Sequence, residues 1–130
     1  MSQSERIDLD LDHLLSMTGG DPDLAEEVLD IFRHQVEIWA RMLDSRAPAE
    51  QWADAAHTLK GAALSIGAAE LAESCQKAER AGRDLPPSQA GAALLLNEVK
   101  DLIASTLEAC GRASYALSRP GLRASNASNS

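Results

Sequence analysis

The sequence predicts an all-α protein, an antiparallel up-down four-helix bundle with a short additional helix at its N-terminus. The composition favours this fold, because only 3% of the 130 residues are aromatic and the helix-favouring residues Ala and Leu far outnumber the β-branched residues. Apolar residues also recur at three- and four-residue steps through several long segments, as in helices with one buried face. The length suits one domain with its own core and is short for two.

The first two helices are predicted on either side of a Gly-Gly turn. A short helix covers about residues 8–17 and ends at Gly19 and Gly20. The second helix begins at Asp21, with Pro22 at its first position, and stops near residue 45. We expect one buried stripe along it, made of Leu24, Val28, Ile31, Phe32, Ile38, Trp39, Met42 and Leu43.

Three more helices complete the predicted bundle. The third covers about residues 49–66, with Gly67 as its C-cap and a core stripe of Trp52, Ala56, Leu59, Ala63 and Ile66. The fourth covers 68–81 and is followed by Gly82, and a rigid "LPPS" turn leads to the fifth, 89–117. The inner face of the fifth helix is predicted to hold Leu95, Val99, Leu102, Ile103, Leu107 and Cys110.

We expect the domain to span residues 1–118, and residues 119–130, which are small and polar, to form a disordered tail or linker. All four long helices lie in one chain, so a monomer is expected. The two cysteines, Cys75 and Cys110, form neither a CxxC motif nor a disulfide framework, so they are interpreted as reduced, packed thiols of a cytoplasmic protein.

Charge and hydropathy exclude several classes of function. The net charge of −8 and the pI near 4.7 argue against nucleic acid as a partner, since nucleic-acid binders usually carry a basic patch. No apolar run approaches the ~20 residues needed to cross a bilayer, so no membrane association is expected. The acidic N-terminus also lacks the apolar core of a secretory signal.

One stretch of the third helix carries a pattern that packing does not explain. His57 lies one position past Ala56, about 100° round the helix, at the edge of the core stripe or outside it. Lys60 and Gly61 follow at i+3 and i+4, next to His57 on the helix surface. Gly costs a helix about 1 kcal/mol relative to Ala, so Gly61 needs a compensating reason.

Phosphoryl chemistry supplies that reason. An exposed neutral imidazole has a nucleophilic nitrogen, and a phosphoryl group placed on it would bring negative charge that Lys60 could attract. A partner would have to bring its reactive group to the ring, and Gly61 has no side chain to obstruct that approach.

The segment "AHTLKGAALSIGA", residues 56–68, resembles the signature of histidine phosphotransfer (HPt) domains of two-component phosphorelays. That signature is an apolar residue, the phosphoaccepting His, one variable residue, then Leu, Lys, Gly and small residues. Two flanking segments, "LDLDHLLSMTGGDPDLAEEVLDIF" and "ELAESCQKAERAGR", are similar to the family as well. The resemblance covers about residues 7–117, nearly the whole predicted domain.

The resemblance implies that His57 accepts the phosphoryl group, that Lys60 stabilises it, and that Gly61 provides clearance. The implied partners are response-regulator receiver domains and a histidine kinase. The chain itself would bind no cofactor, because the receiver supplies the Mg²⁺. The resemblance thus implies a phosphocarrier, a protein that passes the phosphoryl group to or from the aspartate of a receiver.

The resemblance also suggests residues around the histidine. Thr58, Ser65 and Gln76 are assigned to the partner surface, and Leu64 belongs either to the bundle or to an apolar docking patch. In phosphotransfer domains of chemotaxis kinases, a second His and a Glu on the next helix surround the phosphoacceptor. Glu79 matches that Glu and is counted with the partner surface, with its contact to the imidazole left open. Gln76 stands where the second His would be, which favours an ordinary phosphorelay domain.

Two alternatives remain open at this point: a phosphoacceptor (P1-type) module of a larger chemotaxis-type kinase, and a helical adaptor whose histidine is not phosphorylated. No autonomous kinase activity is expected, because the sequence has no Walker A or kinase-like Gly-rich loop. Asp54 and His57, at i and i+3, resemble half of a di-iron carboxylate site. The second Glu-x-x-His pair is missing, so no metal site is expected.

Overall fold

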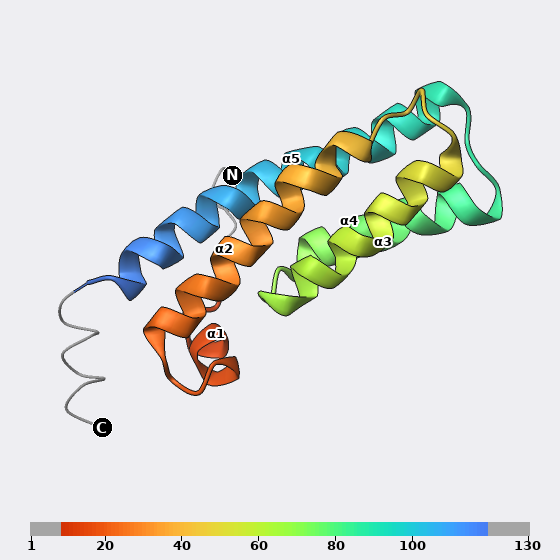
Figure 1. Cartoon of the computed structure of the whole chain (residues 1–130). Coiled ribbons are helices and arrows are strands. Elements are labelled where there is room, and N and C mark those ends of the chain that lie inside the picture. Colours follow the sequence, from red (N-terminus) through yellow and green to blue (C-terminus); the bar gives the residue numbers. More distant parts are fainter. Residues whose placement is uncertain (1–8, 120–130) are drawn as a thin grey trace, which may run out of the picture.

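The structure, a computed structural model, describes residues 9–119. The elements in chain order are α1 (Leu11–Met17), α2 (Pro22–Trp39), the short 3₁₀ helix η2 (Ala40–Met42), α3 (Ala49–Ser65), α4 (Ala69–Asp84) and α5 (Gln89–Leu117). Helices α2 and α5 lie side by side, the α3–α4 hairpin packs against them, and α1 lies at the end where α2 begins (Figure 1). The predicted all-α up-down bundle with a short N-terminal helix is confirmed over these residues.

Side chains of the residues just before the helices explain where three of the helices begin. Asp10 accepts a hydrogen bond from the backbone N–H of His13, so α1 begins at Leu11. Asp21 caps α2, with Pro22 at the first helical position as predicted, and Ser88 caps α5 by accepting from the N–H of Gly91. The predicted start of the first helix at residue 8 lies outside the described residues.

The turn between α3 and α4 follows the predicted glycine. Gly67 has φ +75°, the left-handed conformation in which a side chain would be strained. The N–H of Ala68 donates to the carbonyl of Ala63 at 2.9 Å, and the N–H of Gly67 donates to that of Leu64 at 3.2 Å. These two bonds form a Schellman motif, so Gly67 ends α3 and lets α4 return beside it.

The core stripe predicted for the third helix is confirmed. All five of its members are at most 2% exposed: Trp52, Ala56, Leu59, Ala63 and Ile66. They pack with buried residues from the other helices, among them Leu14, Phe32, Leu71 and Val99. The face of α5 is partly as predicted, since Val99, Ile103 and Cys110 are buried while Leu95, Leu102 and Leu107 are only partly buried.

The predicted stripe of the second helix is wrong in half of its members. The side of α2 that faces the core consists of Pro22, Ala25, Leu29, Phe32 and Val36. Leu24, Ile31 and Ile38 are 42%, 60% and 61% exposed, and Met42, in η2, is exposed as well. One helix can bury only one face, and the small Ala25 together with Leu29 and Val36 occupies it. The larger aliphatic residues, spaced seven apart, therefore form a second face that points to solvent.

Gly82 was predicted to follow the fourth helix, and this is wrong, because α4 continues to Asp84. Gly82 is a buried residue inside α4. A Cβ built on it would lie 2.8 Å from a ring carbon of Trp52 and 2.9 Å from the Cβ of Ala53. The glycine therefore allows α4 to lie directly against the Trp52 side of α3, and close packing rather than chain termination explains it.

Both cysteines are free and buried, as their interpretation required. Burial raises the pKa of Cys75 to about 12 and that of Cys110 to about 11, so both thiols remain protonated at neutral pH. None of the helices within residues 9–119 is long and apolar enough to cross a bilayer. Apart from Arg119, the predicted tail lies outside the described residues.

The close packing at Gly82 predicts that a side chain added there lowers the stability of the protein. Gly82→Ala should lower the free energy of unfolding by about 1 kcal/mol, since overpacking costs about 1–3 kcal/mol and the better helix propensity recovers about 1 kcal/mol. The matched control is Gly111→Ala in α5, where an added Cβ meets no atom within 4 Å, so stability should rise by up to about 1 kcal/mol. Urea denaturation followed by circular dichroism measures both, and equal stabilisation of the two variants would contradict the close packing at Gly82.

Candidate functional site

The packing of α3 places His57 on the outside of the bundle. Its neighbours in sequence, Ala55 and Ala56, are fully buried, and they turn the imidazole outward. The side chain of His57 is 63% exposed. One turn further along, Lys60 is partly buried and Gly61 is exposed. The helix thus presents a histidine, a cation and a position without a side chain on one accessible surface, which we call the histidine face.

Helix α4 brings a carboxylate to this histidine. Nδ1 of His57 lies 3.0 Å from Oε2 of Glu79, whose side chain is only 17% exposed. An ionised carboxylate can only accept hydrogen bonds, so the imidazole Nδ1–H must be the donor. The other ring nitrogen, Nε2, has no hydrogen-bond partner among the residues that the structure describes, which leaves it open to solvent as the nucleophilic nitrogen of a neutral ring.

Cations surround the Glu79 carboxylate on its remaining sides. Nε of Arg83 lies 3.4 Å from Oε2, and Nζ of Lys60 lies 3.9 Å from Oε1. Arg83 also donates through its terminal nitrogen to Asp54 at 2.8 Å. The hydrogen bond to Asp54 raises the pKa of the Arg83 guanidinium, and the contact with Glu79 raises it further, so Arg83 remains a cation.

Next to the histidine face, α2 and α3 line an open cavity of about 230 Å³. Ile31, Phe32 and Gln35 come from α2, and Gly61, Ala62 and Ser65 come from α3. A Cβ added to Gly61 would meet no atom within 4 Å, so nothing in the described part of the chain requires a glycine there. Leu64, three positions after Gly61 on α3, is 58% exposed and therefore belongs to the surface rather than to the bundle core.

The structure brings together only part of the residues singled out from the sequence. His57, Lys60 and Glu79 meet, with Glu79 between the two others. Thr58 and Gln76 are partly buried and make no hydrogen bond with the imidazole in the described part of the chain. The hydroxyl of Ser65 donates to the carbonyl of Ala62 at 2.6 Å, one turn back on its own helix.

Three residues of this region were missed as site residues. Arg83 lies four positions after Glu79, a spacing at which an ion pair on one helix face is expected, so the sequence held a signal for it. Asp54 was considered only as half of a metal site, and its partner is Arg83. Ile31 was assigned to the core. No group of three His, Cys, Asp or Glu residues within residues 9–119 is arranged to hold a metal ion.

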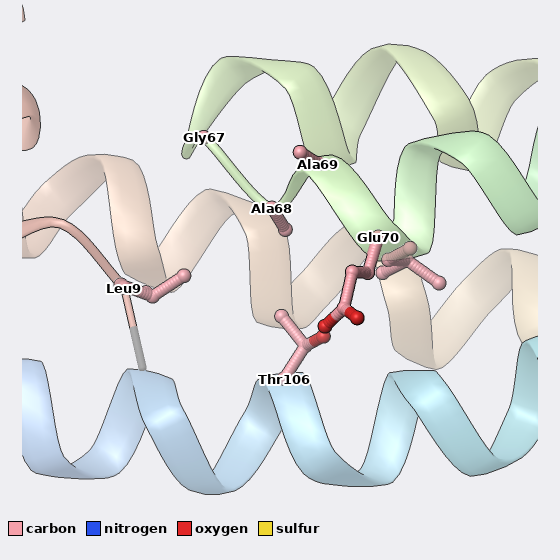
Figure 2. Close-up of a pocket in the computed structure, with 7 residues that line it drawn as sticks. Leu9, Gly67, Ala68, Ala69, Glu70 and Thr106 are labelled. Atoms are coloured by element: carbon pink, nitrogen blue, oxygen red, sulfur yellow. The ribbon is translucent and has the colours of Figure 1, made fainter. Parts of the chain in front are cut away.

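A second cavity, of about 170 Å³, lies at the turn between α3 and α4 (Figure 2). It is lined by Leu9, Gly67, Ala68, Ala69, Glu70, Leu71 and Thr106. Gly67 is ten positions beyond His57, about 15 Å along a helix. The hydroxyl of Thr106 donates to the carbonyl of Leu102 at 2.6 Å and is therefore already engaged. This cavity takes no part in the histidine face.

Comparison with known proteins gives two similarities. A family model described as the Hpt domain matches residues 23–109, more than half of the chain. The crystal structure of histidine phosphotransferase ShpA from Caulobacter crescentus is similar at 36% sequence identity and a TM-score of 0.53, and the match covers 80% of this chain and 95% of that one. A search of curated proteins found no match.

The His57–Glu79 contact predicts which ring nitrogen carries the proton. In the neutral state His57 should be the Nδ1–H tautomer, and Glu79→Ala should allow the proton to move to Nε2, because the acceptor is gone. Long-range ¹H–¹⁵N correlation spectra of the imidazole distinguish the two forms. His34 is the control in the same spectrum, since its Nδ1 lies 2.9 Å from the carbonyl oxygen of Asp30 and should keep its proton in both proteins. An unchanged tautomer of His57 in the variant would contradict the prediction.

Proposed function

The chain belongs to the Hpt domain family of histidine phosphotransfer proteins, and we propose that His57 is the residue that carries the phosphoryl group. The observation that carries this proposal is the state of the imidazole. Glu79 occupies Nδ1, while Nε2 lies open on an exposed ring. His13 and His34, the other two histidines, have no Lys-Gly pair after them in the sequence, and Nδ1 of His34 bonds to its own helix backbone.

The geometry supports a defined transfer step from an aspartyl phosphate. The lone pair of Nε2 attacks phosphorus, the P–N bond forms while the P–O bond to the aspartate breaks, and the aspartate leaves as a carboxylate. The proton on Nδ1 stays in place, so the phosphorylated ring is a cation, and the Glu79 carboxylate lies against it. Lys60, one turn away, attracts the oxygens of the phosphoryl group. The same steps in reverse return the group to an aspartate.

Hpt proteins are phosphocarriers, and we propose that this chain has no kinase activity of its own. The histidine face supplies a nucleophile and charge, while the acid pocket and the Mg²⁺ come from the receiver domain. The rate enhancement would then come mainly from positioning and from electrostatic stabilisation by the partner. We also propose that the chain acts as a monomer, because one chain supplies all four long helices of the bundle. Its two free, buried cysteines suit a reducing compartment, and we propose the cytoplasm.

We propose that receiver domains dock over the cavity between α2 and α3. Ile31 lines this cavity together with Gly61, Leu64 follows Gly61 by three positions on α3, and both are about 60% exposed. An apolar surface of this kind around a reactive group suits a partner that must be held while transfer occurs. Thr58, Ser65 and Gln76 are proposed to lie at its border.

The phosphoacceptor assignment predicts complete loss of labelling in one variant. The purified chain, incubated with a phosphorylated receiver and Mg²⁺, should take up label that is acid-labile and base-stable, and His57→Gln should take up none. His34→Gln is the matched control, because it removes another exposed histidine and should transfer like the unmodified chain. Several donors are needed to find a competent one. Equal labelling of the His57 variant would move the site elsewhere, and binding of receivers without any labelling would favour a helical adaptor.

If Gly61 provides clearance for the partner, a side chain added there should impair phosphoryl transfer without lowering the stability of the chain. Gly61→Leu should keep or raise stability by up to about 1 kcal/mol, because a Cβ at this position meets no atom within 4 Å in the described part of the chain, the cavity beside it is open, and leucine favours helices. At a packed interface, the same side chain should cost about 1–3 kcal/mol, which raises the half-saturating receiver concentration roughly fivefold to 150-fold. Gly111→Leu in α5, also with open space, should leave transfer unchanged. Normal transfer by the Gly61 variant would refute the clearance role.

A further inference from the structure

Four side chains of α3 and α4 form a continuous series of contacts at the histidine face. Asp54 binds Arg83, Arg83 contacts Glu79, and Glu79 accepts a hydrogen bond from His57. Asp54 and His57, at the two ends of this series, both lie on α3. We propose that Arg83 is a positioning residue, which holds the Glu79 carboxylate so that His57 keeps its Nδ1–H inward and its Nε2 toward the partner. This inference rests on the proposed function of His57.

The contacts place Arg83 and His57 on the same oxygen. Oε2 of Glu79 lies 3.0 Å from Nδ1 of His57 and 3.4 Å from Nε of Arg83. At 3.4 Å the arginine contact is long for a hydrogen bond and acts mainly as an ion pair. The other end of the guanidinium is held more tightly, at 2.8 Å from Asp54. Because Asp54 lies three positions before His57 on α3, both ends of this series of contacts are fixed by one helix.

A restraint on Glu79 is needed because its side chain is long. A glutamate has three rotatable bonds, and holding it in one rotamer costs conformational entropy. The planar guanidinium has donors fixed in direction, so contact with two carboxylates at once defines its orientation. Arg83 thereby limits where Oε2 can lie, and the position of Oε2 determines the orientation of the imidazole.

Lys60 does not replace Arg83 in this role. Its Nζ lies 3.9 Å from the other oxygen, Oε1, and an ammonium on a flexible stem defines no direction. If Arg83 holds the carboxylate, Lys60 is free to turn toward the phosphoryl group when it arrives. The two cations therefore have different roles: Arg83 orients the glutamate, and Lys60 attracts the oxygens of the transferred phosphoryl group.

A double-mutant cycle between Arg83 and Glu79 tests the proposal. Arg83→Gln should slow transfer within the docked complex about threefold to tenfold and leave the half-saturating receiver concentration within about twofold, since a group acting through another alters orientation and not docking. In a Glu79→Ala background, Arg83→Gln should have no further effect. Additive effects in the two backgrounds, or a change in half-saturation alone, would overturn the proposal and make Arg83 a direct contact of the receiver.

A second measurement needs no phosphoryl transfer. In ¹H–¹⁵N spectra of the imidazole, Arg83→Gln should lower the Nδ1–H population of His57, and Asp54→Asn should act in the same direction but less. Arg80→Gln is the matched control, because Arg80 lies on the same helix, is exposed, and makes no ion pair with any residue between 9 and 119. An effect of Arg80→Gln as large as that of Arg83→Gln would overturn the proposal, since net charge alone would then explain it.

If no donor labels His57, the proposed function fails, while these spectra still decide the role of Arg83. Exposed ion pairs contribute little to stability, so all of these variants should fold.

Discussion

Everything at the histidine face depends on the close approach of α3 and α4. The buried residues of these two helices are mostly small, and at Gly82 the missing side chain makes room for Trp52 and Ala53. Across this close contact a glutamate on α4 reaches a histidine on α3 with a 3.0 Å hydrogen bond. A small-residue interface thus serves the site as much as the core, because it fixes the distance across which Glu79 and Arg83 act.

The site shows how little a phosphocarrier has to provide. One nitrogen of His57 is occupied by Glu79, the other is open, and a lysine lies one turn away. In the proposed transfer, the phosphorylated ring would be a cation next to a carboxylate that two other cations also contact. This balance suits a group that must be accepted and then released, because a carboxylate without those cations would hold the charged product more strongly.

The surface beside the site is apolar in a way that the fold does not require. Ile31 and Leu64 are each more than half exposed and lie outside the hydrophobic core. The proposed docking of a receiver would account for exposed aliphatic residues near an open cavity and the exposed histidine. The bundle is stabilised elsewhere, along the stripe of α3 and the inner faces of α2 and α5, so the proposed docking surface can change without loss of the core.

The sequence by itself determined the helices, their order, the Gly67 turn and the histidine pattern, because these depend on local propensity, capping and spacing within one helix. It did not determine which of two apolar faces of α2 is buried, since Ile31 and Leu29 are alike as side chains and only the neighbouring helices distinguish them. Nor could it decide that Gly82 lies inside α4 or that Glu79 and Arg83 meet His57 and Asp54. Those relations join residues that are 22 or more positions apart, and the distance and rotation between two helices exist only once the helices have packed.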